Sequence, residues 1–123
     1  MVSRFEKITQ VINKKHKDAS LLAFVRIDEG QDTWTILFSS PLISYTGRGD
    51  EIRKQVFADI SKALNETQDE TPGTTVVRVG IFPLDRHIIK DALKFKAGTH
   101  ITEPTRMNGN TVFEGYITIS KSN

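Results

Sequence analysis

Apolar residues near the start of the chain recur three or four positions apart, which is the spacing of one helix face. This pattern predicts an amphipathic helix over residues 4–17. Ser3 and Glu6 have the spacing of a capping box, in which each side chain bonds a backbone N–H of the other residue. The apolar face of this helix is formed by Phe5, Ile8, Val11 and Ile12.

Two segments rich in β-branched and aromatic residues follow, at 21–28 and 33–40. The four residues between them, E-G-Q-D at 29–32, are typical of a turn, so the two segments are predicted to form a β-hairpin. Alternate residues from Trp34 to Phe38 are large and apolar, which indicates that one face of the second strand is the more deeply buried.

The middle of the chain alternates between helical and extended patterns. Apolar positions predict a helix over 51–66, which ends before the polar segment 67–73. Residues 74–82 are apolar on both faces, which is typical of a central strand. A third helix is predicted to follow, with Asp85 as its N-cap and Gly98 as its C-terminal stop.

The end of the chain contains Asn108-Gly109, the dipeptide favoured in type I′ turns of β-hairpins. Residues 99–107 and 110–120 are therefore predicted to be the two arms of a hairpin. The apolar residues of the second arm alternate, so they are expected on one face. They are Phe113, Ile117 and Ile119.

The predicted element order is α-β-β-α-β-α-β-β. It favours an α+β fold, with a mixed sheet of about five strands and helices packed mainly on one face. A chain of 123 residues is long enough for one hydrophobic core and too short for two, so residues 1–123 are expected to form a single domain.

The amino-acid composition excludes several classes of site and of protein. The chain has no cysteine, which excludes disulfides, thiol catalysis and cysteine-ligated zinc. The first residues, M-V-S-R-F-E-K, lack the apolar segment of a signal peptide, and no apolar run reaches the length that spans a membrane. A soluble, cytoplasmic protein without a membrane partner is therefore expected.

The formal net charge of +2 is distributed unevenly. Residues 1–20 carry five basic and two acidic residues, a surplus of +3, and residues 84–100 carry four and two, a surplus of +2. A nucleic-acid-binding domain usually has a stronger and more clustered surplus, so support for nucleic acid is weak. The lysine run N-K-K-H-K at 13–17, including His16, is interpreted as a solvated helix end.

Two strand-to-helix junctions mark the place where function is expected. The first reads P-L-I-S-Y-T-G-R-G-D-E over 41–51, and the second spans 83–87. A right-handed crossover makes the preceding strands parallel, so both junctions should lie at the same edge of the sheet. Ligands of open sheets bind preferentially at this edge.

An anion-binding site is the first hypothesis for this edge. Helix N-termini offer free N–H groups, glycines let the backbone approach a ligand, and arginines supply forked donors. The aspartates at the same helix starts disfavour a second negative charge, and turn geometry alone accounts for the glycines. The candidate ligand-binding residues are Tyr45, Gly47, Arg48, Gly49, Arg86, His87 and Lys90.

A metal site is the alternative. Asp50, Asp85 and His87 could ligate Mg²⁺ in an enzyme that acts on phosphates, such as a nuclease or a nucleotide hydrolase. Helix capping explains both aspartates without a metal. The tripeptide R-G-D at 48–50 is interpreted as part of a turn and a helix start.

The expected function is therefore that of a small binding or regulatory protein. It would act through protein contacts, or by holding a nucleotide, phosphate or nucleic acid at the edge formed by 41–51 and 83–87. No catalytic residue and no cofactor are assigned in this interpretation. Its partner would be a protein, an anionic small molecule or a second copy of the chain.

Overall fold

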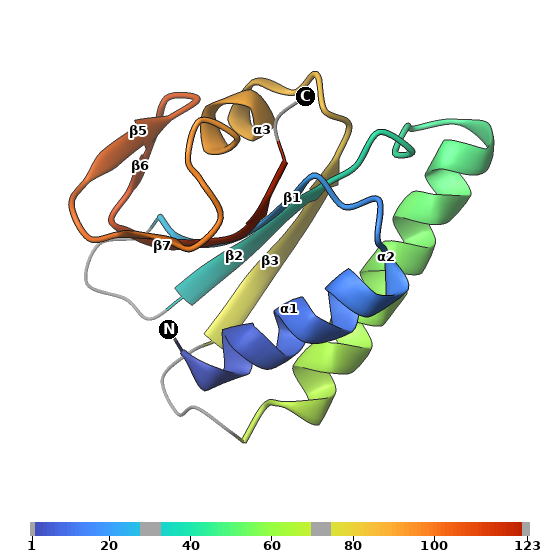
Figure 1. The fold of residues 1–123 in the computed structure, drawn as a ribbon, viewed down its shortest axis with the longest axis horizontal. Helices are drawn as coiled ribbons and strands as arrows, with labels where there is room; N and C mark the ends of the chain where they lie inside the picture. The colour runs from blue at the N-terminus through green and yellow to red at the C-terminus, as the bar shows by residue number, and fades with distance from the viewer. Residues whose placement is uncertain (1, 28–32, 70–74, 122–123) are drawn as a thin grey trace.

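The computed structural model describes residues 2–27, 33–69 and 75–121 (Figure 1). The predicted turn at 29–32 and part of the polar segment 67–73 lie outside these residues. Within them, the helices and strands follow the predicted order, and the last two predicted strands are divided into four. The elements are α1 (Ser3–Lys15), β1 (Leu21–Arg26), β2 (Thr33–Ser39), α2 (Gly47–Glu66), β3 (Thr75–Phe82), α3 (His87–Ala92), β4 (Thr99–Ile101), β5 (Thr105–Met107), β6 (Asn110–Val112) and β7 (Glu114–Ser120).

The main sheet has five strands in the order β3-β2-β1-β7-β4. β1 is antiparallel to β2 and β7, β4 is antiparallel to β7, and β2 and β3 run parallel. This mixed sheet confirms the predicted α+β fold. β3 lies at the edge of the sheet, so the prediction of a central strand was wrong. The apolar residues on both of its faces are explained by cover from both layers, since Val79 packs against one core cluster and Phe82 against the other.

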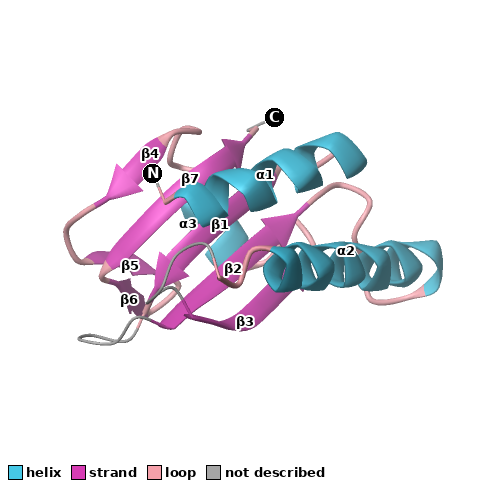
Figure 2. Cartoon of the chain, turned by 90° about the horizontal axis from the view of Figure 1, so that it is seen from below, coloured by secondary structure: helices cyan, strands magenta, loops and turns pink. Residues whose placement is uncertain are grey.

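α1 and α2 lie together on one face of the sheet (Figure 2). The face predicted for α1 is buried there, and the Phe5 ring stacks on Phe24 with 4.2 Å between centroids. Burying each large apolar side chain contributes roughly 1.5–3 kcal/mol, so this layer is a principal source of stability. The helix residues buried in it are Phe5, Ile8, Ile12, Val56, Ile60 and Ala63.

The opposite face is covered by α3 and by the small hairpin of β5 and β6. Ile89, Ala92, Met107 and Val112 from this layer form a core cluster with residues of β1 and β7 and with Leu37 of β2. β1 is therefore buried on both sides, which explains why its sequence, L-L-A-F-V-R, lacks polar alternation. Two of the three helices share one face, as predicted, and the short α3 lies on the other.

The predicted helix starts were displaced. α1 has Val2 as its N-cap and no side-chain cap, so the capping box of Ser3 and Glu6 does not form. α2 begins at Gly47 rather than at residue 51, because the backbone N–H of Asp50 already bonds the Thr46 carbonyl at 3.3 Å.

The third helix also begins later and is shorter than predicted. Its N-cap is Arg86 rather than Asp85. The backbone N–H of Arg86 bonds the Pro83 carbonyl at 3.3 Å, so Asp85 lies inside a tight turn and is not available as the cap.

A β-bulge separates two residues that were expected on the same face. Leu22 pairs with Ile119 and Ala23 with Ile117, so Thr118 is an extra residue in β7. Its hydroxyl donates to the Leu22 carbonyl at 3.1 Å. Ile117 consequently packs with α3 and Ile119 with α1, and the prediction that they share a face was wrong.

The turn between β5 and β6 is formed as predicted. Asn108 has φ 47° and Gly109 has φ 79°, the two positive values that a type I′ turn requires. The arms on either side of the turn are only three residues long, because the flanking segments join the main sheet as β4 and β7. None of the helices in the described ranges has the length and apolar character of a membrane-spanning segment.

Candidate functional site

The two strand-to-helix junctions lie next to each other at one edge of the sheet. β2 and β3 are parallel, and their last residues, Ser39 and Phe82, are register partners. The Ser39 hydroxyl donates to the Phe82 carbonyl at 2.6 Å, and the Ser39 side chain is fully buried. This hydrogen bond holds the two strand ends together, so the loops that leave them start from fixed and adjacent positions.

An open groove of about 670 Å³ runs between these loops. The first loop contributes one wall and the second loop contributes the other. Leu42 and Tyr45 in the first loop are each 50% exposed and lie three positions apart. The residues lining the groove are Ser40, Pro41, Ile43, Ser44, Tyr45, Pro83, Leu84, Asp85 and Arg86.

The groove includes only part of the predicted ligand set. Tyr45 and Arg86 line it together. The five predicted residues that do not line it are Gly47, Arg48, Gly49, His87 and Lys90.

The two glycines have structural roles. Gly47 has φ +59°, a conformation that other residues adopt only with strain. A Cβ atom at Gly49 would meet the Ser44 hydroxyl oxygen at 2.0 Å and the Ser44 backbone nitrogen at 2.8 Å. Gly49 is thus explained by the close approach of the preceding loop, without reference to a ligand.

Asp50 is bound by cations of its own helix. Arg53 donates to its carboxylate at 2.6 Å, and Lys54 lies 3.4 Å from the other carboxylate oxygen. The hydrogen bond from Arg53 is the main cause that lowers the pKa of Asp50. The guanidinium of Arg53 also lies 5.7 Å from the Tyr45 ring centroid. Arg53 was missed by the sequence analysis, although its spacing of three from Asp50 predicts this pair.

Arg86 and Asp85 give the second wall both signs of charge. The Arg86 guanidinium lies 5.2 Å from the centroid of the Phe82 ring, which is a cation–π distance. Asp85 is exposed next to it. An anion entering the groove would therefore approach a carboxylate as well as a guanidinium.

The structure does not bring together the residues predicted for the alternative metal site. Asp50, Asp85 and His87 are not brought together, and within residues 2–27, 33–69 and 75–121 no three His, Asp or Glu side chains form a group that could hold a metal. Asp50 is instead occupied by Arg53 and Lys54.

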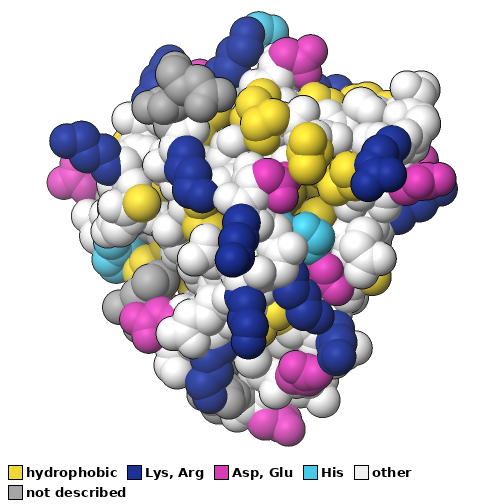
Figure 3. All heavy atoms as spheres, turned by 45° about the vertical axis from the view of Figure 1, so that its right-hand side comes forward, with side chains coloured by type: hydrophobic (Ala, Val, Ile, Leu, Met, Phe, Trp, Pro, Cys, Tyr) yellow, Lys and Arg dark blue, Asp and Glu magenta, His cyan; other side chains and the backbone are white. Residues whose placement is uncertain are grey.

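The lysine run at 13–17 contains one residue that the sequence analysis misplaced. His16 is buried rather than solvated, and its Nε2 lies 2.7 Å from the Asp59 carboxylate of α2. Lys14 and Lys15 border a small groove between α1 and α2, together with Lys62, Asp59 and Glu66. Lys and Arg side chains follow one another down the middle of the face shown in Figure 3, with Asp and Glu side chains beside them.

Comparison with known proteins adds no candidate ligand or partner. No family model, no curated protein and no solved structure matches the chain. Its function is therefore inferred from the residues and their geometry.

Proposed function

We propose that the chain is a small binding protein that holds a protein partner in the groove between residues 40–45 and 83–86. The observation that carries this proposal is the exposure of Leu42 and Tyr45 beside a groove whose two walls start from hydrogen-bonded strand ends. Exposed apolar side chains on a rigid support lose little conformational freedom on binding, and this reduces the cost of association.

The chemistry of the groove fits a protein surface. Tyrosine and arginine are enriched in protein–protein interfaces, and Tyr45 and Arg86 line opposite walls. Asp85 and Arg86 supply neighbouring charges of opposite sign, which would orient a partner at the rim. A partner with an apolar side chain flanked by one basic and one acidic residue would complement this arrangement.

An anionic ligand at the same edge has weaker support. Arg48 does not line the groove, and Asp85 places a carboxylate on the wall that holds Arg86. A phosphate would therefore meet one guanidinium and one carboxylate rather than two guanidinium groups. Contact with a protein uses both of these charges and also the exposed apolar residues.

The proposal is tested by selecting peptides from a random phage-displayed library on the wild-type chain. The selected peptides are then measured by fluorescence anisotropy against the variant L42S/Y45S and against F57S. Phe57 is 51% exposed on α2 and does not line the groove, so it matches the tested residues in exposure. We expect the double variant to weaken binding at least about tenfold, a loss typical of truncating two interface anchors.

F57S is expected to retain wild-type affinity. Peptides that bind wild type and L42S/Y45S equally well would refute the groove as the binding site. A selection on the wild-type chain that enriches no peptide would also count against the proposal.

A further inference from the structure

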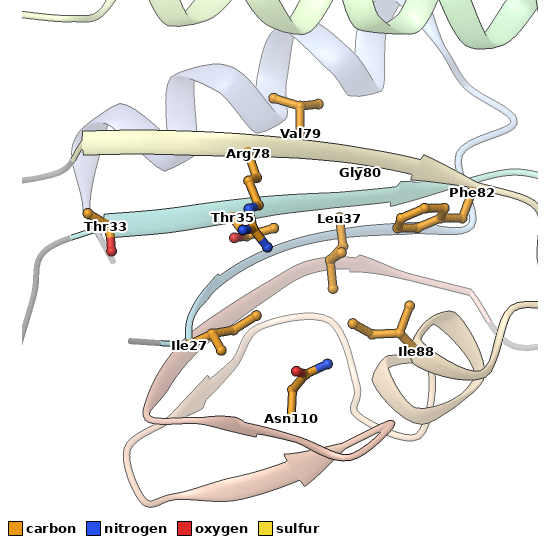
Figure 4. Close-up of a pocket in the computed structure, with 10 residues that line it drawn as sticks. All are labelled: Ile27, Thr33, Thr35, Leu37, Arg78, Val79, Gly80, Phe82, Ile88 and Asn110. Carbon is orange, nitrogen blue, oxygen red and sulfur yellow. The ribbon is translucent and has the colours of Figure 1, made fainter. Parts of the chain in front are cut away.

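A second cavity lies on the sheet face that carries α3 and the β5–β6 hairpin (Figure 4). Its volume is about 440 Å³, within the range of roughly 300–1,000 Å³ typical of small-molecule sites. β2 and β3 form one side, and α3 and the hairpin face them. It is lined by Ile27, Thr33, Thr35, Leu37, Arg78, Val79, Gly80, Phe82, Ile88 and Asn110.

The cavity lies between the second layer and the sheet. The buried residues of α3 and the hairpin share a core cluster with residues of β1 and β7 and with Leu37 of β2, and the cavity remains between this layer and the facing surface of β2 and β3. Gly80 also shapes the space, because a Cβ atom there would meet the Phe82 ring at 2.6 Å. The glycine therefore lets the Phe82 ring lie against β3 and form one end of the cavity.

Apolar side chains form one part of the cavity wall. Figure 4 shows the side chains of Leu37, Ile27 and Ile88 pointing into the space from three different segments. Phe82 closes one end, whereas the side chain of Val79 points to the other face of the sheet. An apolar body placed between Leu37, Phe82 and Ile88 would bury apolar surface against these side chains, which is favourable.

One cationic side chain, that of the exposed Arg78, lies on the wall of this cavity. The guanidinium of Arg78 extends from β3 over Thr35, and the Asn110 amide points into the space from the hairpin. Arg53 and Arg26 are paired with Asp50 and Glu114, but Arg78 pairs with no carboxylate among the residues that the structure describes. Its planar donors are therefore available to a ligand on the cavity side.

We propose that this cavity binds a small amphipathic carboxylate. The carboxylate accepts hydrogen bonds from Arg78, a charge-assisted pair that can be bidentate, and Thr35 and Asn110 lie on the walls beside it. The hydrocarbon part occupies the space between Leu37, Phe82 and Ile88. This site is separate from the groove between residues 40–45 and 83–86, and the proposal does not depend on a protein partner binding there.

The test is a titration followed by the backbone amide signals in ¹H–¹⁵N NMR spectra. The probes are hexanoate, octanoate, decanoate and 4-phenylbutyrate, each with its neutral primary amide. We expect saturable shifts for at least one carboxylate, centred on Thr35, Gly80 and Asn110. The matching amide should bind at least about tenfold more weakly, since it lacks the charge that Arg78 recognises.

Variants separate the site from non-specific binding. Arg78→Gln should reduce carboxylate affinity at least about tenfold and leave the amide nearly unchanged. Arg106→Gln is the matched control, because Arg106 is an exposed arginine on β5 that does not line the cavity. Asn110→Trp should abolish binding by filling the space, and thermal melting would verify that each variant is folded.

Three results would overturn the proposal. They are the absence of saturable shifts with every carboxylate, shifts centred outside the cavity, and equal carboxylate affinity in wild type and Arg78→Gln.

Discussion

The hydroxyl group of Ser39 donates a hydrogen bond of 2.6 Å to the backbone carbonyl of Phe82, which lies 43 positions later in the sequence. The bond joins the ends of two parallel strands at the point where the loops of the candidate groove begin. The Phe82 ring in turn contacts the Arg86 guanidinium, and it also lines the second cavity. Both proposed sites are therefore built next to this contact.

Replacing Ser39 with alanine should destabilise the fold. The hydroxyl is fully buried, so its loss removes one hydrogen bond and leaves the Phe82 carbonyl without this donor. We expect the free energy of unfolding, measured by urea denaturation, to fall by about 1–2 kcal/mol. Ser3→Ala, at an exposed position, should change it by less than about 0.5 kcal/mol. Equal stabilities of the two variants would show that the buried hydrogen bond contributes nothing.

The contact between His16 and Asp59 should couple α1 to α2. The two side chains are only 11% and 12% exposed, and their atoms lie 2.7 Å apart. A double-mutant cycle with His16→Ala and Asp59→Ala is expected to give a coupling energy of about 1–3 kcal/mol.

The matched comparison is the pair of Lys62 and Glu66 on α2. These side chains are 67% and 59% exposed and lie 4.0 Å apart, so the same cycle should give at most about 0.5 kcal/mol. Coupling energies of similar size for both pairs would contradict the effect of burial.

The contact between Asp91 and Asn108 should make stability depend on pH. The Asp91 carboxylate accepts the backbone N–H of Asn108 at 2.7 Å, and this hydrogen bond is the main cause that lowers the pKa of Asp91. A carboxyl group whose pKa is lower in the folded state stabilises the fold above its unfolded pKa, about 3.9, and this contribution is lost as the pH falls through the folded pKa.

Wild type should therefore be more stable than Asp91→Ala at neutral pH, and the difference should shrink at acidic pH. The amide proton shift of Asn108 should titrate with a midpoint below about 3.9. A midpoint at or above this value would contradict the role of the hydrogen bond.

Alanine substitutions should separate the roles of the two glycines at the start of α2. Gly47→Ala forces a Cβ atom into a positive φ of 59° with open space around it, which should cost about 1–2 kcal/mol. Gly49→Ala should cost more, because the new Cβ would meet the backbone nitrogen of Ser44 at 2.8 Å. Thermal and urea unfolding of both variants would measure the difference, and a neutral Gly49→Ala would show that this loop adjusts freely.

Local sequence patterns were sufficient for much of the architecture. The helical spacing of Phe5, Ile8 and Ile12 identified the buried face of α1, and Asn108-Gly109 identified the turn between β5 and β6. The β2–α2–β3 connection implied parallel strands with adjacent junctions. These features depend on residues close together in the chain or on the handedness of one crossover, so they can be predicted from the sequence.

The ligand-binding details could not be obtained in the same way. Tyr45 and Arg86 share a groove, but Arg48 does not line it, although all three were predicted ligand-binding residues of the junction sequences. Arg78 was not a candidate in the sequence because nothing near it in the chain marks a cavity. Its surroundings come from β2, α3 and the β5–β6 hairpin, which only the folded chain assembles.

The sequence by itself thus determined the α+β class, the buried helix faces and the neighbouring junctions, because short-range periodicity and chain connectivity encode them. The tertiary structure decided that β3 is an edge strand, that Thr118 forms a bulge and that α3 lies on the face opposite α1 and α2. It also decided that the cover over β2 and β3 leaves a cavity beside Arg78. The physical reason is that these features arise from packing between segments that are distant in the sequence. Several arrangements are compatible with the same local pattern, and the one observed is the one in which the core residues pack together.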